Sequence, residues 1–121
     1  MCIYTHKMFE TITKKDIIAI NQKFDKGQIV NGSSLEYAIY HANKTKSWSR
    51  ACAVLVRAVL IDHVFEEGNK RTAAAIITGF FENNNLRYEP EKVARCIANI
   101  LTDNITNLIK IEKVILYAII R

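Results

Sequence analysis

Proline is almost absent from this chain, with one residue among 121. Because proline interrupts helices, its scarcity favours a mostly helical domain, and half of the residues are hydrophobic, as a compact core requires. The chain also lacks repeats, low-complexity tracts and linkers. At this length there is room for a single core, so we expect one domain over residues 1–121.

Long hydrophobic segments are absent too. The longest apolar run, Val114 to Ile120, contains Tyr117 and is far too short to span a bilayer. The first residues, Met1 to Lys7, do not form the apolar stretch of a signal peptide. We therefore expect a protein without membrane contact that works in the cytoplasm.

Paired cysteines are missing as well. Cys2, Cys52 and Cys96 are odd in number and widely spaced, and no Cys-x-x-Cys pair occurs. Cys52 and Cys96 lie among apolar residues, where a free thiol acts as a small hydrophobic group. The pattern favours structural thiols in a reducing compartment over a zinc or redox site.

Acidic residues are in the minority, with twelve against seventeen Lys and Arg, which gives a net charge of +5. Such an excess permits nucleic-acid binding, but the basic residues are scattered and form no block. A solvated basic surface or an acidic partner explains them equally well. We do not expect nucleic acid to be the main partner.

The first half of the chain predicts two helices with a break between them. Thr13 followed by Asp16 is a helix start, and Ile17, Ile20 and Phe24 would form its buried stripe. Residues 25–34 break this pattern, and Asn31-Gly32 is a turn dipeptide, so a short extended flap or hairpin fits there. Ser33 with Glu36 three residues later would begin the second helix.

The second half predicts four more helices. Ser47 would cap a nearly all-apolar helix that runs to about Asp62, and another helix would end at the asparagines 83–85. Residues 86–90 would form an extended connection, and two closing helices would span 91–101 and 107–120. The sequence thus predicts an all-α fold of about six helices around one central hydrophobic helix, with at most a short flap or hairpin.

The polar stretch between the two most apolar helices holds the most chemistry. A histidine, a carboxylate, a glycine, an amide and two cations stand within nine residues: His63, Glu67, Gly68, Asn69, Lys70 and Arg71. This cluster opens a helix, where unpaired N–H groups favour a bound anion, phosphate above all. Positive charge at a helix N-terminus is unfavourable without an anion, which makes two idle surface cations the weaker interpretation.

Each side chain of the cluster suits phosphoryl transfer. Neutral imidazole at His63 can accept a proton from an attacking hydroxyl, although a histidine that only bonds helix carbonyls is the alternative. The Glu67 carboxylate can hold Mg²⁺ against phosphates. Lys70 and Arg71 would neutralise the transferred group. Gly68 permits a close turn, and Asn69 either bonds phosphate or fixes the loop.

These residues resemble the signature His-x-Phe-x-(Asp/Glu)-Gly-Asn-x-Arg of the Fic/Doc family. The similarity is strongest to the Doc (death-on-curing) branch, in which Lys fills the variable place and Thr-Ala follows, as Lys70, Thr72 and Ala73 do here. The resemblance implies the helical Fic/Doc fold and an ATP site at residues 68–71. It also implies His63 and Arg71 as catalytic residues and Glu67 as the ligand of Mg²⁺.

The resemblance further implies a toxin. Doc-type proteins transfer the γ-phosphate of ATP to a hydroxyl of a translation elongation factor and are inhibited by a separate antitoxin chain. The flap, with Ile29, Val30, Asn31 and Gly32, would dock the target, although the local sequence alone indicates only a loop.

Two other functions remain open. The first is Fic-type AMP transfer (AMPylation) to a protein hydroxyl, but the branch that performs it has a second glycine at the place of Lys70 and often an arginine at that of Ala74. The second is an RNA-directed toxin or binding module that does not use ATP, with His63 and Arg71 as its reactive groups.

Overall fold

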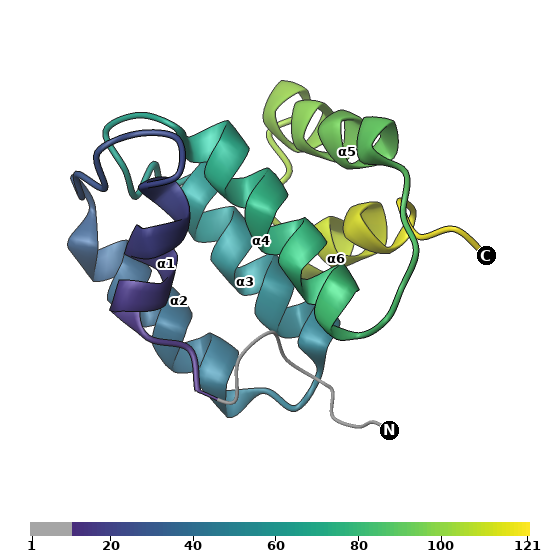
Figure 1. Cartoon of the computed structure of the whole chain (residues 1–121), viewed down its shortest axis with the longest axis horizontal. Coiled ribbons are helices and arrows are strands. Elements are labelled where there is room, and N and C mark those ends of the chain that lie inside the picture. Colours follow the sequence, from purple (N-terminus) through teal and green to yellow (C-terminus); the bar gives the residue numbers. More distant parts are fainter. Residues whose placement is uncertain (1–10) are drawn as a thin grey trace.

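The fold is all-α, as the sequence predicts (Figure 1). The structure, a computed structural model, describes residues 11–121, so Cys2 and the first residues of the chain lie outside the described part. Within residues 11–121 six helices and no strand are formed. In chain order they are α1 (Lys14–Asn21), α2 (Gly32–Lys44), α3 (Trp48–Leu60), α4 (Asn69–Asn83), α5 (Pro90–Thr102) and α6 (Leu108–Leu116).

Helix α3 is the predicted central hydrophobic helix. Ten of its thirteen residues are buried, which is possible only for a helix with neighbours on nearly every side. It packs against α2, α4 and α6, and Figure 1 shows it in the middle of the molecule. Ser47 caps its first turn by accepting a hydrogen bond from the Arg50 N–H, as predicted.

Helix α1 begins as predicted but ends earlier. Thr13 and Asp16 form a reciprocal capping box, and Ile17 and Ile20 are buried. Phe24 does not continue this stripe: it follows the end of the helix and is 38% exposed, so the prediction was wrong there. The last residue of α1 is instead Asn21, which is fully buried.

The start of α2 also differs from the prediction. Asn31, not Ser33, is the N-cap, and its side chain accepts a hydrogen bond from the Ser34 N–H. The Asn31-Gly32 dipeptide therefore begins a helix rather than a hairpin turn, because Asn suits both positions. The extended flap shortens to Gln28–Val30 and forms one isolated antiparallel bridge, between Ile29 and Phe65.

The end of the chain is less helical than predicted. Helix α6 ends at Leu116, four residues before the predicted boundary. Residues 118–120 then run antiparallel to residues 87–89, with Tyr88 paired to Ile119. This turn brings Ala118 into the core, where it is fully buried. No helix within residues 11–121 has the length and apolar character needed to cross a membrane.

Candidate functional site

The predicted site is the loop from Ile61 to Gly68, which joins α3 to α4 at one end of the molecule (Figure 1). Val64 and Phe65 anchor the loop in the core, with 0% and 1% of their surfaces exposed. His63 and Glu66 on either side of this anchor are exposed. The anchor therefore turns the polar residues of the loop toward solvent, where a substrate can reach them.

His63 has an unusual backbone conformation. Its φ of 51° lies in the left-handed region. This conformation is energetically unfavourable for any residue other than glycine, so it occurs where the surrounding structure imposes it. The buried Val64 that follows supplies that constraint. The His63 side chain lies on the exposed side of the loop.

The Asn69 side chain fixes the loop. Its Oδ1 accepts a hydrogen bond from the Phe65 N–H at 3.1 Å, and its Nδ2 donates to the Phe65 carbonyl at 2.8 Å. The Asn69 side-chain amide thus bonds both the N–H and the C=O of Phe65, the two backbone groups that point away from the flap. Of the two roles considered for Asn69, the structure shows the positioning one.

Gly68 is the N-cap of α4 and has a φ of 80°, a left-handed conformation that glycine adopts without cost. Its carbonyl accepts the first helical bond, from the Thr72 N–H. No side chain caps this helix. Within residues 11–121, the N–H groups of Asn69, Lys70 and Arg71 find no acceptor, so three donors face outward at the positive end of the α4 dipole.

Asn21 holds this arrangement together, and the sequence analysis missed it. Its buried Nδ2 donates to the carbonyl of Glu67 and to Oγ1 of Thr72, both at 3.0 Å. Its Oδ1 accepts from the Gly27 N–H at 2.8 Å. The only sequence signal was a polar residue directly after the apolar Ile20 at the end of a helix.

The shortened flap lies along the loop. The Val30 N–H donates to the Val64 carbonyl at 2.8 Å, and the Glu66 N–H donates to the Gln28 carbonyl at 2.9 Å. In this antiparallel pairing the N–H and C=O of Ile29 point away from the loop, and they bond no group within residues 11–121. One free backbone edge therefore runs beside the loop, next to Val30, which is 59% exposed.

Asn31 and Gly32 belong to α2 rather than to this edge. The Asn31 Nδ2 donates to the Asp62 carbonyl at 2.9 Å, and Ser34 Oγ donates to the Asp62 carboxylate. Helix α2 is thereby tied to the residue just before His63. Of the four residues predicted to dock a target, only Ile29 and Val30 lie on the extended edge.

The charged side chains of the motif are exposed and open to a ligand. Glu67, Lys70 and Arg71 form no ion pair with any other residue in the described range 11–121. That range also contains no group of three His, Cys, Asp or Glu side chains able to hold a metal ion. Glu67 alone suits an Mg²⁺ ion that takes its other ligands from water and phosphates, as the ion does in nucleotide sites, rather than an all-protein cage.

Three cavities described below lie away from this loop, and none of them is lined by a residue of 61–73. The site is formed at the exposed edge where the loop meets α4: His63 and Glu67 lie on the loop, and Lys70 and Arg71 lie in the first turn of the helix. Such an edge can bind an anion through backbone N–H groups without a deep pocket.

Comparisons with protein-family models, with curated protein sequences and with solved structures gave no match. The similarity to the Fic/Doc signature therefore rests on residues 63–73 themselves. The fold and the loop geometry are observed, and the activity that they suit is a proposal.

Proposed function

We propose that this chain is a Doc-like toxin that transfers the γ-phosphate of ATP to a Ser or Thr hydroxyl of a target protein. The observation that carries the proposal is the loop at residues 63–71. There an exposed imidazole lies beside the α4 N-terminus, where, within residues 11–121, no side chain caps the helix and a carboxylate and two cations form no ion pair. A translation elongation factor is the target that the motif suggests, and the cytoplasm is where the two would meet.

The α4 N-terminus would hold the triphosphate. Its free N–H groups, together with Lys70 and the guanidinium of Arg71, neutralise phosphate oxygens, and Arg71 can contact two oxygens at once. Bound beside Glu67, Mg²⁺ would add positive charge to the same phosphates. The terminal phosphate is then positioned next to His63.

His63 would act as the general base. Its imidazole takes the proton of the target hydroxyl while the hydroxyl oxygen attacks the γ-phosphorus. The bond from this phosphorus to the bridging oxygen breaks, and ADP leaves with the electron pair. Lys70 and Arg71 stabilise the charge that spreads over the oxygens during the transfer.

The free edge at Ile29 would receive the target. An extended segment pairs with its outward N–H and C=O groups as an added strand. A segment added to this edge would lie on the side of the flap away from the loop, one strand spacing from Ile29, which lies opposite Phe65, two residues from His63. A separate antitoxin chain would then inhibit the protein by occupying this region.

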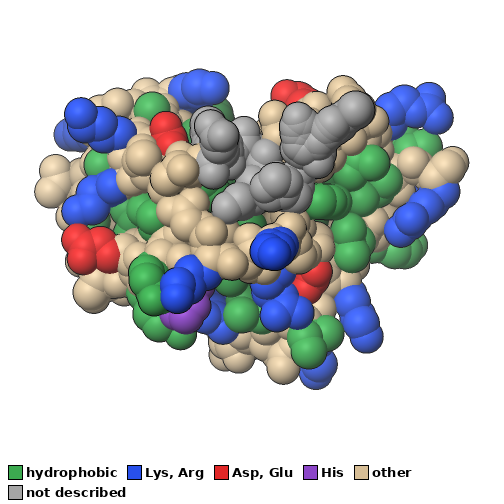
Figure 2. Space-filling view, turned by 90° about the horizontal axis from the view of Figure 1, so that it is seen from below, with side chains coloured by type: hydrophobic (Ala, Val, Ile, Leu, Met, Phe, Trp, Pro, Cys, Tyr) green, Lys and Arg blue, Asp and Glu red, His purple; other side chains and the backbone are tan. Residues whose placement is uncertain are grey.

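RNA-directed action is a second candidate, and one observation favours it. A cavity of about 290 Å³ between α2 and α3 is lined by Tyr37, His41, Lys44 and Arg57, among others. Figure 2 shows basic and hydrophobic side chains gathered around a histidine on one face of the molecule. Rings and cations together are the usual components of single-stranded nucleic-acid sites.

Labelled ATP separates these functions. The purified protein is incubated with an elongation factor, Mg²⁺ and ATP labelled on either the α- or the γ-phosphate. We expect γ-label on the target and about a 10²- to 10⁴-fold loss of rate in His63→Ala, as for removal of a general base. In cells that express the protein, the Arg71→Ala variant should no longer arrest growth. The His41→Ala and Arg87→Ala variants lack similar groups elsewhere in the molecule and should still arrest growth.

The outcomes point in different directions. Transfer of the α-label identifies AMP transfer instead of phosphorylation. Cleavage of RNA without ATP supports the second candidate. Full activity of folded His63→Ala excludes the proposed base.

A further inference from the structure

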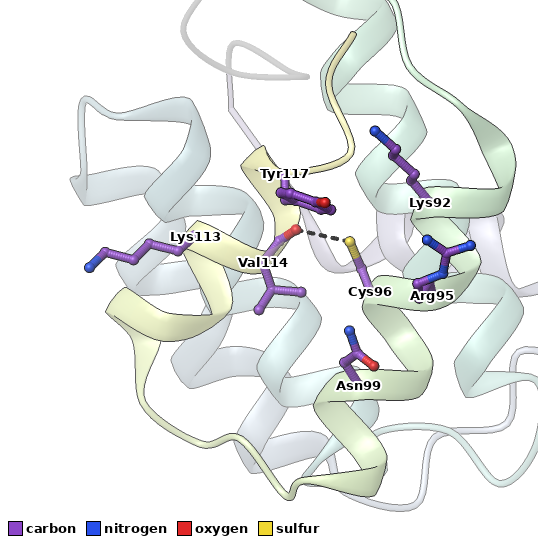
Figure 3. Close-up of a pocket in the computed structure, with 7 residues that line it drawn as sticks. All are labelled: Lys92, Arg95, Cys96, Asn99, Lys113, Val114 and Tyr117. Carbon is purple, nitrogen blue, oxygen red and sulfur yellow. Dashed lines mark hydrogen bonds between the residues drawn. The ribbon is translucent and has the colours of Figure 1, made fainter.

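A groove between α5 and α6 lies far from the loop at residues 61–68 (Figure 1). Its main cavity has a volume of about 280 Å³. Figure 3 shows that its walls come from both helices: Lys92, Arg95, Cys96 and Asn99 from α5, and Lys113 and Val114 from α6, with Tyr117 just after it.

The groove carries positive charge on both sides. In Figure 3, Lys92 and Arg95 lie on the α5 side and Lys113 extends outward on the α6 side. Among the described residues 11–121, none of those that line this cavity is acidic. Within residues 11–121 neither Arg95 nor Lys113 forms an ion pair, and Lys92 approaches only Glu89, with Nζ 3.8 Å from the carboxylate.

The floor between these cations is apolar. Tyr117 is 70% exposed, and Lys92 Nζ lies 5.1 Å from the centre of its ring. The Cys96 thiol donates to the Val114 carbonyl at 2.9 Å, and burial raises its pKa to about 11. The thiol is therefore protonated near neutral pH and contributes surface rather than reactivity.

A second cavity of about 350 Å³ extends the groove. It shares Lys92 and Tyr117 with the first and adds Glu89, Ile119, Ile120 and Arg121. Both cavities combine apolar side chains with cations, and the second also has the Glu89 carboxylate, which Lys92 Nζ approaches to 3.8 Å. A chain segment of several residues fits such a surface better than a single small molecule does.

We propose that this groove binds an acidic, amphipathic segment of another protein chain. A bulky apolar side chain of the segment packs on Val114 and Tyr117. Its carboxylates pair with Lys92 and Arg95 on one side and with Lys113 on the other. The apolar floor disfavours a nucleic acid, whose phosphates need cations along the path and whose bases need more than one free ring.

This groove is independent of the proposed phosphotransfer. It contains none of residues 61–73, and a segment bound here leaves His63 and the α4 N-terminus open. It would bring a partner to the molecule without covering the loop.

Peptide selection tests the inference. A library of random twelve-residue peptides on phage is selected against the full chain and counter-selected against an Arg95→Glu/Lys113→Glu double variant. We expect enriched peptides with several Asp or Glu residues around a large apolar one. In fluorescence anisotropy their binding should weaken about tenfold or more in the double variant, because two attractive charges become repulsive. A Lys15→Glu/Lys23→Glu variant changes the net charge equally, at exposed residues in and just after α1 that line none of these cavities, and should bind within about twofold of wild type.

Three results would overturn the proposal. The first is that no peptide is enriched, or that enriched peptides lack acidic residues. The second is equal binding to both double variants. The third is that a twelve-nucleotide single strand of DNA binds as tightly and loses binding in the same variant, since the groove would then attract polyanions in general. Arg95 and Lys113 are exposed, so circular dichroism should show both variants folded.

Discussion

At the scale of single residues, the loop owes its shape to contacts that join distant parts of the chain. The sequence placed His63 and Glu67 correctly on a loop, and Lys70 at the start of the next helix, because apolar helices flank this stretch on both sides. It did not reveal Asn21, because a buried amide finds its partners only when α1 is packed against the loop. Local patterns predict where a polar loop falls, whereas the bonds that hold it depend on tertiary packing.

Gly68→Ala should destabilise the protein. At a φ of 80° an added Cβ is strained, and it would lie 3.1 Å from Asn21 Nδ2 and 3.3 Å from Asp25 Cβ. We expect a loss of about 1–3 kcal/mol in the free energy of unfolding, measured by urea denaturation. Gly32→Ala is the matched control, because its Cβ would meet only Ile29 Cγ2 at 3.6 Å, and it should leave stability unchanged or slightly higher. Equal effects of the two substitutions would contradict this account.

At the scale of helices, caps were predicted well where a hydroxyl residue stood at the start of a helical pattern with no competing cap nearby. Thr13 and Ser47 are such residues, and both cap as predicted. Asn31 was missed because Ser33 offered a competing start and Asn-Gly is also a turn dipeptide. The choice depends on Asp62, whose carbonyl accepts from Asn31 and whose carboxylate binds Ser34. Asp62 lies far away in the sequence, so no local pattern decides between the two caps.

The substitution Asn31→Ala should therefore lower the free energy of unfolding by more than the loss of an ordinary N-cap does. It removes the bond to the Ser34 N–H and the bond to the Asp62 carbonyl, and we expect a loss of about 1–2 kcal/mol in unfolding free energy. Ser33→Ala should change it by less than about 0.5 kcal/mol, because Ser33 is exposed. Urea denaturation of both variants checks the assignment, and the reverse order would restore Ser33 as the cap.

Helices α3 and α6 are joined by a carboxylate that should make stability depend on pH. Burial raises the pKa of Glu112, but hydrogen bonds from Ser49 and Arg50 outweigh it and leave the pKa below the usual 4.5. Because the pKa of Glu112 is lowered in the folded state, its ionised carboxylate stabilises the fold above pH 4.5. This stabilisation is lost as the pH falls through the pKa of Glu112 in the folded state.

Glu112→Gln should accordingly be less stable than wild type by about 1 kcal/mol at pH 7, and this difference should vanish in acid. Urea denaturation at several pH values measures it. The substitution Ser49→Ala removes one of the two hydrogen-bond donors to Glu112. Its effect on the free energy of unfolding should therefore be smaller in the Glu112→Gln background than in wild type. A difference that stays constant from pH 7 to acid would show that the charge of Glu112 contributes nothing.

At the scale of the whole molecule, a bundle of six helices with α3 at its centre was predictable, because apolar periodicity and capping residues are local features. The end of α6 at Leu116 was not predictable, because the residues from Val114 to Ile120 are apolar enough to continue a helix. What ends α6 is the pairing of residues 118–120 with residues 87–89, a contact between segments that are adjacent only in the folded chain. The Ile29–Phe65 bridge likewise could not be predicted from local sequence. It joins the predicted flap to the loop that carries His63.

The position of α3 and α5 predicts that the molecule opens in stages. Cys52 is fully buried in α3, which α2, α4 and α6 surround, whereas Cys96 lies in α5, which packs on α4 and α6 at the outside. In a Cys2→Ser background, a thiol reagent should label Cys96 through detachment of α5, with weak dependence on urea. Cys52 should react only through global unfolding, with the full urea dependence of the equilibrium transition. Because burial raises the pKa of both thiols, neither should react in the closed state, and identical urea dependence at the two sites would mean that α5 and the core unfold as one unit.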